Sequence, residues 1–419
     1  MARGYESSVP LMRARGYGDG LDFAAQTDLP GADRPEPLVP PQFIVGIEER
    51  MDYKGEALLR VDEQNVREQI RRLVDKGAQA FVVSLVNAVV NPAHEKEVER
   101  IILSEYPTHV LGAIPIVLSH RVAGRKAEYS RTMSAVLDAY LHDQMYHGMS
   151  SLEVVLRENG YARPMLLVHN TSGMAQMNST HALQTIHSGP VAGLEATSYL
   201  SAQFKEPNVI ATDMGGTSFD IGLVTADGVK FYDFNPVIDR WLVSTPMTYL
   251  HTLGAGGGSI ARYDRLWEAV EVGPESAGSD PGPACYGRGG KLPTTTDANL
   301  VLGYLDPDNY AGGTIKVNMR RAERAIEEHI AKPTGMSMIE AAKAVKRKVD
   351  ANMASAIFKE VAVKGYNPKN FVILSYGGGG PIHACGYASK IGISRILIPP
   401  FSSVFSALGA GNMDQLHIH

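Results

Sequence analysis

The feature that most constrains this chain is the run TDMGGTSFD from Thr212 to Asp220, where two glycines and a hydroxyl directly follow a strand that ends in aspartate. The apolar residues 209–211 read as the end of a buried strand and 219–224 as its return, so the segment predicts a β-hairpin with a glycine tip. Residues 226–228 predict a second tight turn. Because glycine has no Cβ, a phosphate chain could approach the tip's backbone N–H groups closely.

This chemistry assigns candidate roles to the residues of the hairpin tip. Asp213 is the candidate to hold a divalent cation through water or to position a nucleophile. Gly215 and Gly216 would form a phosphate cradle, and Thr217 would offer its hydroxyl to a phosphate oxygen. Asp220 is a second candidate catalytic carboxylate. A glycine hairpin tip alone is more often only a turn, so the assignment depends on further glycine loops.

Two such loops follow later in the chain, the first at 254–258 and the second at 377–379. The second comes after the apolar run 371–376 and before a predicted helix at 381–391, so it reads as a strand, a tight turn and a helix. A β-branched residue in place of Gly378 would be sterically costly if φ is positive there, and it would block the approach of a nucleotide to the backbone. Neither loop fits the P-loop pattern, and the first lacks the helix, spacing and acidic partner of a Rossmann site. The candidate nucleotide-binding glycines are Gly254, Gly256, Gly257, Gly258, Gly377, Gly378 and Gly379.

Three signatures resemble the actin-like ATPase domain of the hydantoinase A/oxoprolinase family: SGPVAG at 188–193, the run 213–220, and GPESAGSDPGPACYG at 273–287. Residues 296–303 and 406–409 match as well. The third signature is far more specific than any glycine motif, and the resemblance covers nearly the whole chain. It implies an α/β fold with actin-like (ribonuclease H-like) ATPase domains, incomplete at both ends.

The sequence departs from the family pattern in three places. Family members normally begin with a D-x-G-G-T-x-x-D hairpin, and nothing in residues 1–41 replaces it. The chain stops at His419, where family members continue. We therefore expect a fragment, a split subunit or a truncated product, with negligible ATP turnover unless a partner supplies such a hairpin. At 169–174 a Q-S-N-G-G type run is reduced to a single glycine, with His169 in place of glutamine.

Composition excludes several classes of protein. The net charge of -5 and pI of about 6.2 leave no basic footprint for nucleic acid. The two cysteines, Cys285 and Cys385, lie far apart and argue against a disulfide scaffold or a zinc cluster. No apolar run reaches the length of a membrane span, and the N-terminus lacks the apolar core of a signal peptide. Cytoplasm is the expected compartment, without a membrane partner.

Alternating elements predict three regions: an irregular segment at 1–41, a partial N-terminal α/β domain at 42–160, and the actin-like ATPase domain at 161–419. Residues 264–314 are rich in glycine and proline and predict an ordered functional loop region. The remaining expected elements are a helix from Asp62 to Gly77, a strand at 80–86, a helix after Pro92, a strand at 113–118, helices at 128–145 and 337–364, and strands at 163–168 and 395–399.

Other polar residues receive mostly structural interpretations. His169, His251 and His383 are more simply hydrogen-bonding residues than catalytic ones. Cys285 has no neighbouring base or ligand set in the sequence, which favours packing. Asp280 and Asp297 are placed in the cleft only by the family resemblance.

In the resembled family, ATP with Mg²⁺ or Mn²⁺ activates either the carbonyl of a cyclic amide or an enolate together with bicarbonate, and a hydantoinase B-type partner subunit typically finishes the reaction. The resemblance therefore implies an ATP-dependent subunit of an acetone- or acetophenone-type ketone carboxylase. A hydantoinase or oxoprolinase subunit is a close second. An actin-like nucleotide switch that regulates a partner is a third, non-enzymatic interpretation.

Overall fold

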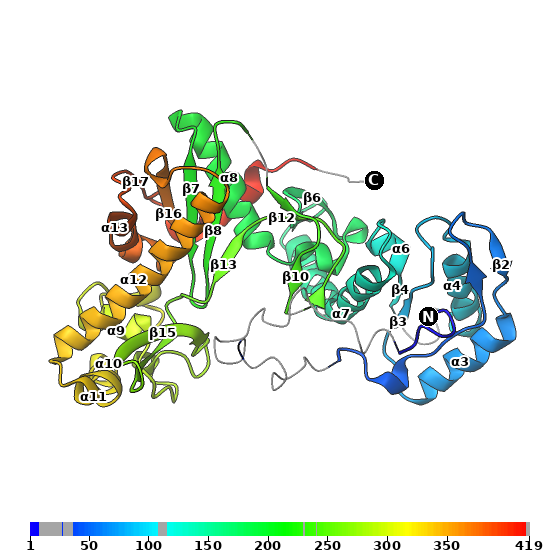
Figure 1. The fold of residues 1–419 in the computed structure, drawn as a ribbon, viewed down its shortest axis with the longest axis horizontal. Coiled ribbons are helices and arrows are strands. Elements are labelled where there is room, and N and C mark those ends of the chain that lie inside the picture. Colours follow the sequence, from blue (N-terminus) through cyan, green and yellow to red (C-terminus); the bar gives the residue numbers. More distant parts are fainter. Residues whose placement is uncertain (8–26, 28–36, 108–114, 229–230, 240, 416–419) are drawn as a thin grey trace. The chain divides into compact units, whose positions relative to one another are not determined.

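The computed structural model describes residues 1–7, 27, 37–107, 115–228, 231–239 and 241–415. The chain divides into two compact units. Unit 1 comprises 1–188, 232–248 and 415–419, and unit 2 comprises 189–231 and 249–414 (Figure 1). Most of the predicted irregular segment 1–41 lies outside the described residues, and the predicted division at 41 and 160 stays a prediction.

Unit 1 contains a two-stranded parallel sheet beside two helices. Strands β3 (Phe81–Val83) and β4 (Ile116–Leu118) pair with Phe81 opposite Ile116. Helix α3 (Glu63–Asp75) begins where the Asp62 carboxylate accepts the amide of Asn65 at 2.9 Å. It ends before Gly77, whose φ is +87°. The cap and stop that the sequence predicts for this helix are confirmed.

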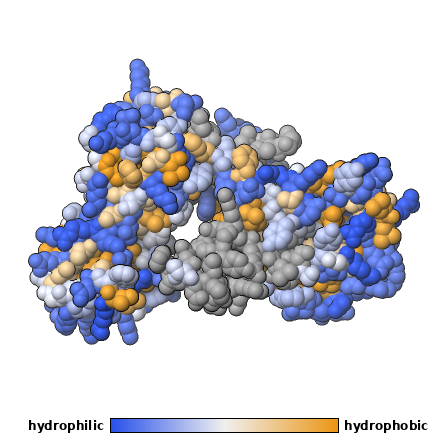
Figure 2. All heavy atoms as spheres, viewed as in Figure 1, coloured by the Kyte–Doolittle hydropathy of each residue, from blue (hydrophilic) through white to orange (hydrophobic). Residues whose placement is uncertain are grey.

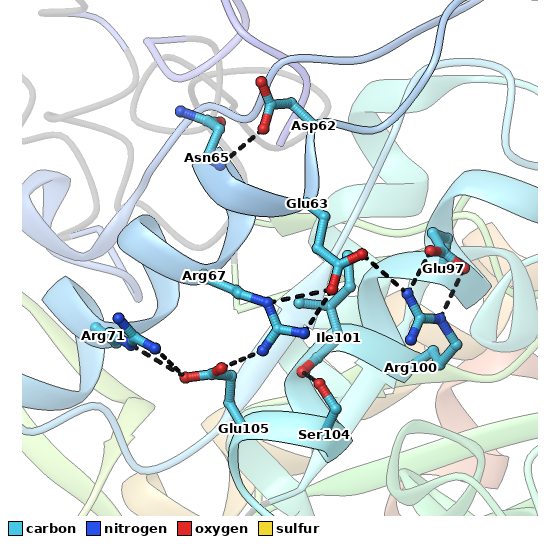
Figure 3. A network of polar contacts seen from close by, with 10 residues as sticks. All are labelled: Asp62, Glu63, Asn65, Arg67, Arg71, Glu97, Arg100, Ile101, Ser104 and Glu105. Carbon is cyan, nitrogen blue, oxygen red and sulfur yellow. Dashed lines mark hydrogen bonds and ion pairs between the residues drawn. The ribbon is translucent and has the colours of Figure 1, made fainter.

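Helix α4 (Ala93–Glu105) packs beside α3, and ion pairs at or near the surface connect the two (Figure 3). Arg67 of α3 bonds to both Glu63 and Glu105, and Arg71 reaches Glu105 at 2.8 Å. The hydrogen bond from Arg71 is the largest cause of a lowered pKa at Glu105. Surface pairs of this kind contribute little stability each, so the buried side chains between the helices hold them together.

The long helix of unit 1, α7 (Glu128–Glu158), continues well past the predicted end at 145. Gly148, a residue that weakens helices, does not end it, and the last turn carries an ion pair between Arg157 and Glu153 at 2.7 Å. The other elements of unit 1 are η1 (Pro41–Phe43), β1 (Arg50–Met51), β2 (Ala57–Leu59), α6 (Ser119–Val122), β5 (Leu166–His169), β6 (Gly173–Gln176), η2 (Met177–Ser179), η3 (Ala182–Thr185), β9 (Tyr232–Asp233), β10 (Val237–Ile238), β11 (Trp241–Leu242) and β12 (Met247–Thr248).

Unit 2 is built on a five-stranded sheet in the order β13-β8-β7-β16-β17. The predicted hairpin is confirmed: β7 (Val209–Met214) pairs with β8 (Phe219–Val224) in an antiparallel ladder. Strand β16 (Val372–Tyr376) runs parallel to β7. The hairpin tip and the glycine turn after β16 therefore lie at the same edge of the sheet. The outer strands are β13 (His251–Leu253) and β17 (Ile396–Leu397).

Helices cover both faces of this sheet. Alternation along β7 places Ile210 in a core with α12 (Met338–Val363) and α13 (Gly380–Ile391), and Ala211 in a second core with α8 (Ser188–Phe204) and α14 (Phe405–Asn412). Helix α12 starts at the capping box of Ser337 and Glu340 and fills the first core along its length. The result is a three-layer α/β arrangement with the sheet in the middle.

The prediction of an irregular region at 264–314 is wrong for part of it. Strand β15 (Ala269–Ser276) pairs with β14 (Ser259–Asp264), and α9 (Thr295–Val301) is a short helix. The interruption of β15 by Gly273-Pro274 hid its alternation, and α9 is too short to show a period. The rest of unit 2 contains η4 (Ala284–Tyr286), η5 (Tyr310–Gly313), α10 (Met319–Ile326), the π-helix η6 (Glu327–Ala331), α11 (Lys332–Thr334), η7 (Pro368–Asn370) and η8 (Ser402–Val404).

The turn predicted at 226–228 is also present, with Gly228 at a φ of +65°. Residues 229 and 230 lie outside the described part of the chain. Among the described residues, no helix is long and apolar enough to cross a membrane.

Candidate nucleotide-binding site

The glycine loops that the sequence places more than a hundred residues apart meet at the tip of the β7–β8 hairpin. The amide of Gly257 donates to the carbonyl of Gly215 at 3.1 Å, and that of Gly258 donates to Gly216 at 2.6 Å. The loop 254–258 is therefore bonded to the back of the tip. The amides of Gly257 and Gly258 hold the tip in place by these two hydrogen bonds.

Only glycine fits in this contact. A Cβ on Gly256 would lie 2.5 Å from the backbone nitrogen of Thr217, and one on Gly258 would lie 2.9 Å from the Ser276 hydroxyl oxygen. By contrast, a Cβ on Gly215 or Gly216 would meet nothing within 4 Å. The first pair of glycines allows backbone packing, whereas the second pair leaves the front of the tip open to a ligand.

The glycine turn after β16 lies against the same tip. The amide of Gly379 donates to the Met214 carbonyl at 2.9 Å. The positive φ of this turn is at Gly377, at +78°, where a Cβ would also run into the Asp213 carboxylate. Gly378 is exposed, is not among the residues with positive φ and has nothing within 4 Å of an added Cβ. Strain is therefore confined to Gly377, and Gly378 is a position where a side chain would meet only a ligand.

Two segments outside the candidate glycine loops support the loop 254–258 from behind. The amide of Ala277 donates to Gly258 at 2.9 Å, and the amide and hydroxyl of Thr296 both donate to Gly257 at 2.8 Å. Both residues belong to stretches that carry the family resemblance, which was the available signal. These stretches act on the site by fixing its glycine loop.

Asp213 and Asp220 face each other directly across the β7–β8 ladder. Asp220 accepts a hydrogen bond from the Thr252 hydroxyl at 2.6 Å. Within the described part of the chain, the side chain of Asp213 has no hydrogen-bond or ion-pair partner. Burial, followed by repulsion from Asp220, raises the pKa of Asp213 from 3.8 to about 6. A half-buried carboxylate without a cationic partner, beside a second carboxylate, favours a bound cation.

The residues present fit a magnesium ion that is shared with a phosphate chain. The described residues form no cluster of three or more His, Cys, Asp or Glu side chains around one point. Mg²⁺ commonly keeps several waters and binds through one or two carboxylates plus substrate phosphates, so a dedicated cage is unnecessary. In front of the carboxylates, Gly216 and Thr217 are exposed, and in the described structure their amides and the Thr217 hydroxyl make no hydrogen bond.

Two profiles of one known protein family match this chain. The profile of the hydantoinase/oxoprolinase N-terminal region matches residues 3–106, and the hydantoinase/oxoprolinase profile matches residues 131–419. The chain belongs to the hydantoinase/oxoprolinase family. The resemblance indicated by the sequence motifs is confirmed, and the mixed α/β fold agrees with the actin-like class that the resemblance implies.

Family members with named activities resemble most or nearly all of the chain. The acetophenone carboxylase gamma subunit of Aromatoleum aromaticum is 44% identical over 99% of this chain and 57% of its own length. The acetone carboxylase beta subunit of Xanthobacter autotrophicus is 32% identical over 90% of this chain and 52% of its own. The caprolactamase subunit alpha of Pseudomonas jessenii is 34% identical over 89% of this chain and 53% of its own length. The chain thus spans little more than half the length of these relatives.

Solved structures of two such enzymes share the fold. A nucleotide-free acetone carboxylase matches with a TM-score of 0.83 at 30% identity, and the ATP-dependent caprolactamase of Pseudomonas jessenii matches with a TM-score of 0.74 at 31% identity. Each match covers 97% of this chain and 57% of the matched enzyme chain.

Two glycines of the family motifs have a packing role. A Cβ on Gly193, in the SGPVAG motif, would lie 2.5 Å from the Tyr376 hydroxyl. A Cβ on Gly409 would collide with the Ala192 backbone. These glycines bring α8 close to β16 and α14 close to α8, so they fix the layer behind the site.

The expectation that Asp297 lies in a ligand cleft is wrong. Its side chain is fully buried and accepts hydrogen bonds from the amides of Ala284, Cys285 and Thr294 and from the Thr294 hydroxyl, at 2.8–3.2 Å. Asp297 is therefore the N3 residue of the capping box that begins at Thr294, and it ties α9 to the segment before it. Asp280 is exposed and stays a candidate by resemblance only.

Replacing Asp297 tests this structural role. We expect Asp297→Asn to lower the free energy of unfolding by about 2–4 kcal/mol, because the amide NH₂ would face buried N–H donors that lose their acceptor. Urea denaturation followed by circular dichroism measures the change. The matched control Asp280→Asn, at an exposed position, should leave the midpoint unchanged. Equal midpoints for all three proteins would contradict the assignment.

The remaining polar candidates agree with their structural interpretation. His383 is fully buried between the Asp350 carboxylate, 2.6 Å from Nδ1, and the Asn299 amide, 2.9 Å from Nε2. His169 contacts the Thr180 hydroxyl at 2.9 Å. Burial raises the pKa of Cys285, so its thiol stays neutral and packs in the interior.

Proposed function

We propose that this chain carries the ATP-binding and phosphoryl-transfer site of a ketone carboxylase of the acetophenone or acetone type. The observation that supports it most is the 44% identity to the acetophenone carboxylase gamma subunit over 99% of the chain, against 34% to the caprolactamase subunit. The substrate would be a small ketone, activated as its enolate together with bicarbonate.

The proposed roles follow from the geometry of the hairpin tip. The exposed amides of Gly216 and Thr217 would bind phosphate oxygens, and the Thr217 hydroxyl would donate to one of them. Asp213 would hold a hydrated cation, with Asp220 as its neighbour across the ladder. A bound Mg²⁺ or Mn²⁺ would supply charge neutralisation to the phosphates. Gly377, Gly378 and Gly379 would lie along the nucleoside, and the loop 254–258 would hold the tip rigid.

The proposal includes a partner and a location. The relatives are named as gamma, beta and alpha subunits, which indicates proteins that work in complexes. We propose a hydantoinase B-type subunit as the partner that completes the reaction, in the cytoplasm. Phosphoryl transfer would then take place on this chain and carbon–carbon bond formation on the partner.

A substrate panel tests the activity. With its partner subunits present, the chain should hydrolyse ATP at least tenfold faster when acetophenone or acetone is added with bicarbonate than with caprolactam or 5-oxoproline. Release of inorganic phosphate and incorporation of labelled bicarbonate are the two readouts. Stimulation by a cyclic amide without bicarbonate would instead assign the chain to the amidohydrolase branch.

That branch is the second candidate, and it has a specific observation in its favour. The ATP-dependent caprolactamase shares the fold at a TM-score of 0.74, and its alpha subunit is slightly more similar in sequence to this chain than the acetone carboxylase beta subunit is, at 34% against 32%. The nucleotide site would serve equally in both, since both reactions begin by phosphorylating an oxygen.

A further inference from the structure

Among the described residues, strand β3 of unit 1 has one edge without a partner strand. In that part of the chain its sheet consists of β3 and β4, and the amide of Phe81 donates to Pro115 at 2.9 Å on the β4 side. Because successive residues of a strand direct their backbone groups to opposite edges, those of Ala80, Val82 and Ser84 point away from β4. Among the described residues, these six N–H and C=O groups make no hydrogen bond.

These groups are not simply exposed to solvent. Ser84 is buried, with 4% of its surface exposed, and Ala80 and Val82 are half-buried. Peptide groups that are shielded from water are nearly always paired in folded proteins, because losing their hydrogen bonds to water is costly. The edge of β3 is therefore incomplete in the described part of the chain.

A cavity of about 370 Å³ lies along this edge. Ala80, Val82 and Ser84 all line it, and so does the segment 38–45, which carries Leu38, Val39, Phe43 and Ile44. Most of its described lining side chains are apolar; the polar ones are Gln79, Ser84 and Thr132, and the N-terminal residue Met1 also lines it. Its walls are therefore mostly apolar, with the row of peptide groups on one side.

We propose that this slot binds an extended, apolar polypeptide segment of a partner subunit, which adds as a strand to the free edge of β3. Only a peptide backbone offers alternating donors and acceptors at the spacing of residues 80, 82 and 84. A small ketone could fill the apolar space but would satisfy at most one of these groups. The mostly apolar walls favour a segment whose alternate side chains are apolar. The proposal is independent of the ATP chemistry, which is located in unit 2.

The test uses the full chain and a synthetic probe, an eight-residue peptide of alternating valine and threonine with a lysine at each end. Hydrogen exchange followed by mass spectrometry or NMR gives the readout. We expect the amides of Val82 and Ser84 to exchange rapidly in the chain alone and to slow at least tenfold with the peptide. The amide of Phe81, already bonded to Pro115, should not change.

Val82→Pro is the matched variant, because it removes an amide that has no partner in the described structure and should leave thermal unfolding unchanged. It should weaken peptide binding at least tenfold, whereas Val82→Thr should not. If the proline variant fails to fold, the same peptide with N-methyl groups on one edge should lose binding to the unaltered chain.

Three results would overturn the proposal. One is slow exchange of Val82 and Ser84 in the chain alone, which would mean that another segment of this chain occupies the slot. The second is a peptide that gives no protection. The third is protection by acetophenone but not by the peptide, which would make the cavity a small-molecule site.

Discussion

Asp213→Asn is expected to abolish Mg-ATP turnover, with a loss on the order of 100- to 1,000-fold, while the fold is kept. The amide has the shape of the carboxylate but not the charge that holds a hydrated cation at the hairpin tip. In the structure the carboxylate makes no hydrogen bond or ion pair within the described residues, so no protein contact is lost in the exchange. Phosphate release in the complete complex measures the effect.

The same variant should be more stable than the unaltered chain at neutral pH when nucleotide and metal are absent. Since the pKa of Asp213 is raised to about 6 in the folded state, the folded protein holds the proton more tightly than the unfolded chain does. That stabilisation is complete below pH 4 and is lost as the pH rises through 6. It corresponds to at most about 3 kcal/mol.

The free energies of unfolding of the two proteins should therefore diverge between pH 4 and pH 7, with the asparagine variant higher at pH 7. Asp308→Asn is the control, because Asp308 is exposed and lies in a loop away from the hairpin. Unimpaired ATP turnover in the Asp213 variant would remove this residue from the metal site. A stability difference that does not depend on pH would show that its carboxyl is not the group that titrates.

The parts of the fold that follow from local chemistry could be predicted from the sequence. The hairpin at 212–220 is fixed by two glycines between two apolar strand-forming runs, and α3 by a capping aspartate and a glycine stop. The end of α7 was misplaced because the helix continues past Gly148 and ends only shortly before Gly160. Strand β15 was missed because Gly273-Pro274 interrupts its alternation.

The candidate site shows the same limit. Each glycine loop is visible in the sequence, but hydrogen bonds between residues far apart bring them together, such as that from Gly257 to Gly215. The sequence could not show that the amides of loop 254–258 are used to hold the hairpin. Nor could it separate Asp297, buried among backbone amides, from Asp213, which has no partner among the described residues. Both are aspartates in glycine-rich surroundings, and only packing distinguishes them.

Gly378→Val is expected to weaken nucleotide binding by on the order of 100-fold, or about 2.7 kcal/mol. Gly378 is exposed, has no neighbouring atom within 4 Å of an added Cβ and does not have a positive φ. The valine side chain would therefore cost the folded protein little and would obstruct a nucleotide that lies against the bare turn. Calorimetric titration with a non-hydrolysable ATP analogue measures the dissociation constant.

The adjacent Gly377→Val separates this effect from a loss of structure. Gly377 has a φ of +78°, and its Cβ would run into Asp213, so this variant should lower the midpoint of thermal unfolding as well as binding. Gly378→Val should lower binding alone, with a thermal midpoint within a degree or two of the unaltered chain. An unchanged dissociation constant for Gly378→Val, in a folded protein that binds the analogue before substitution, would show that the run 377–380 is a structural turn and that the nucleoside lies elsewhere.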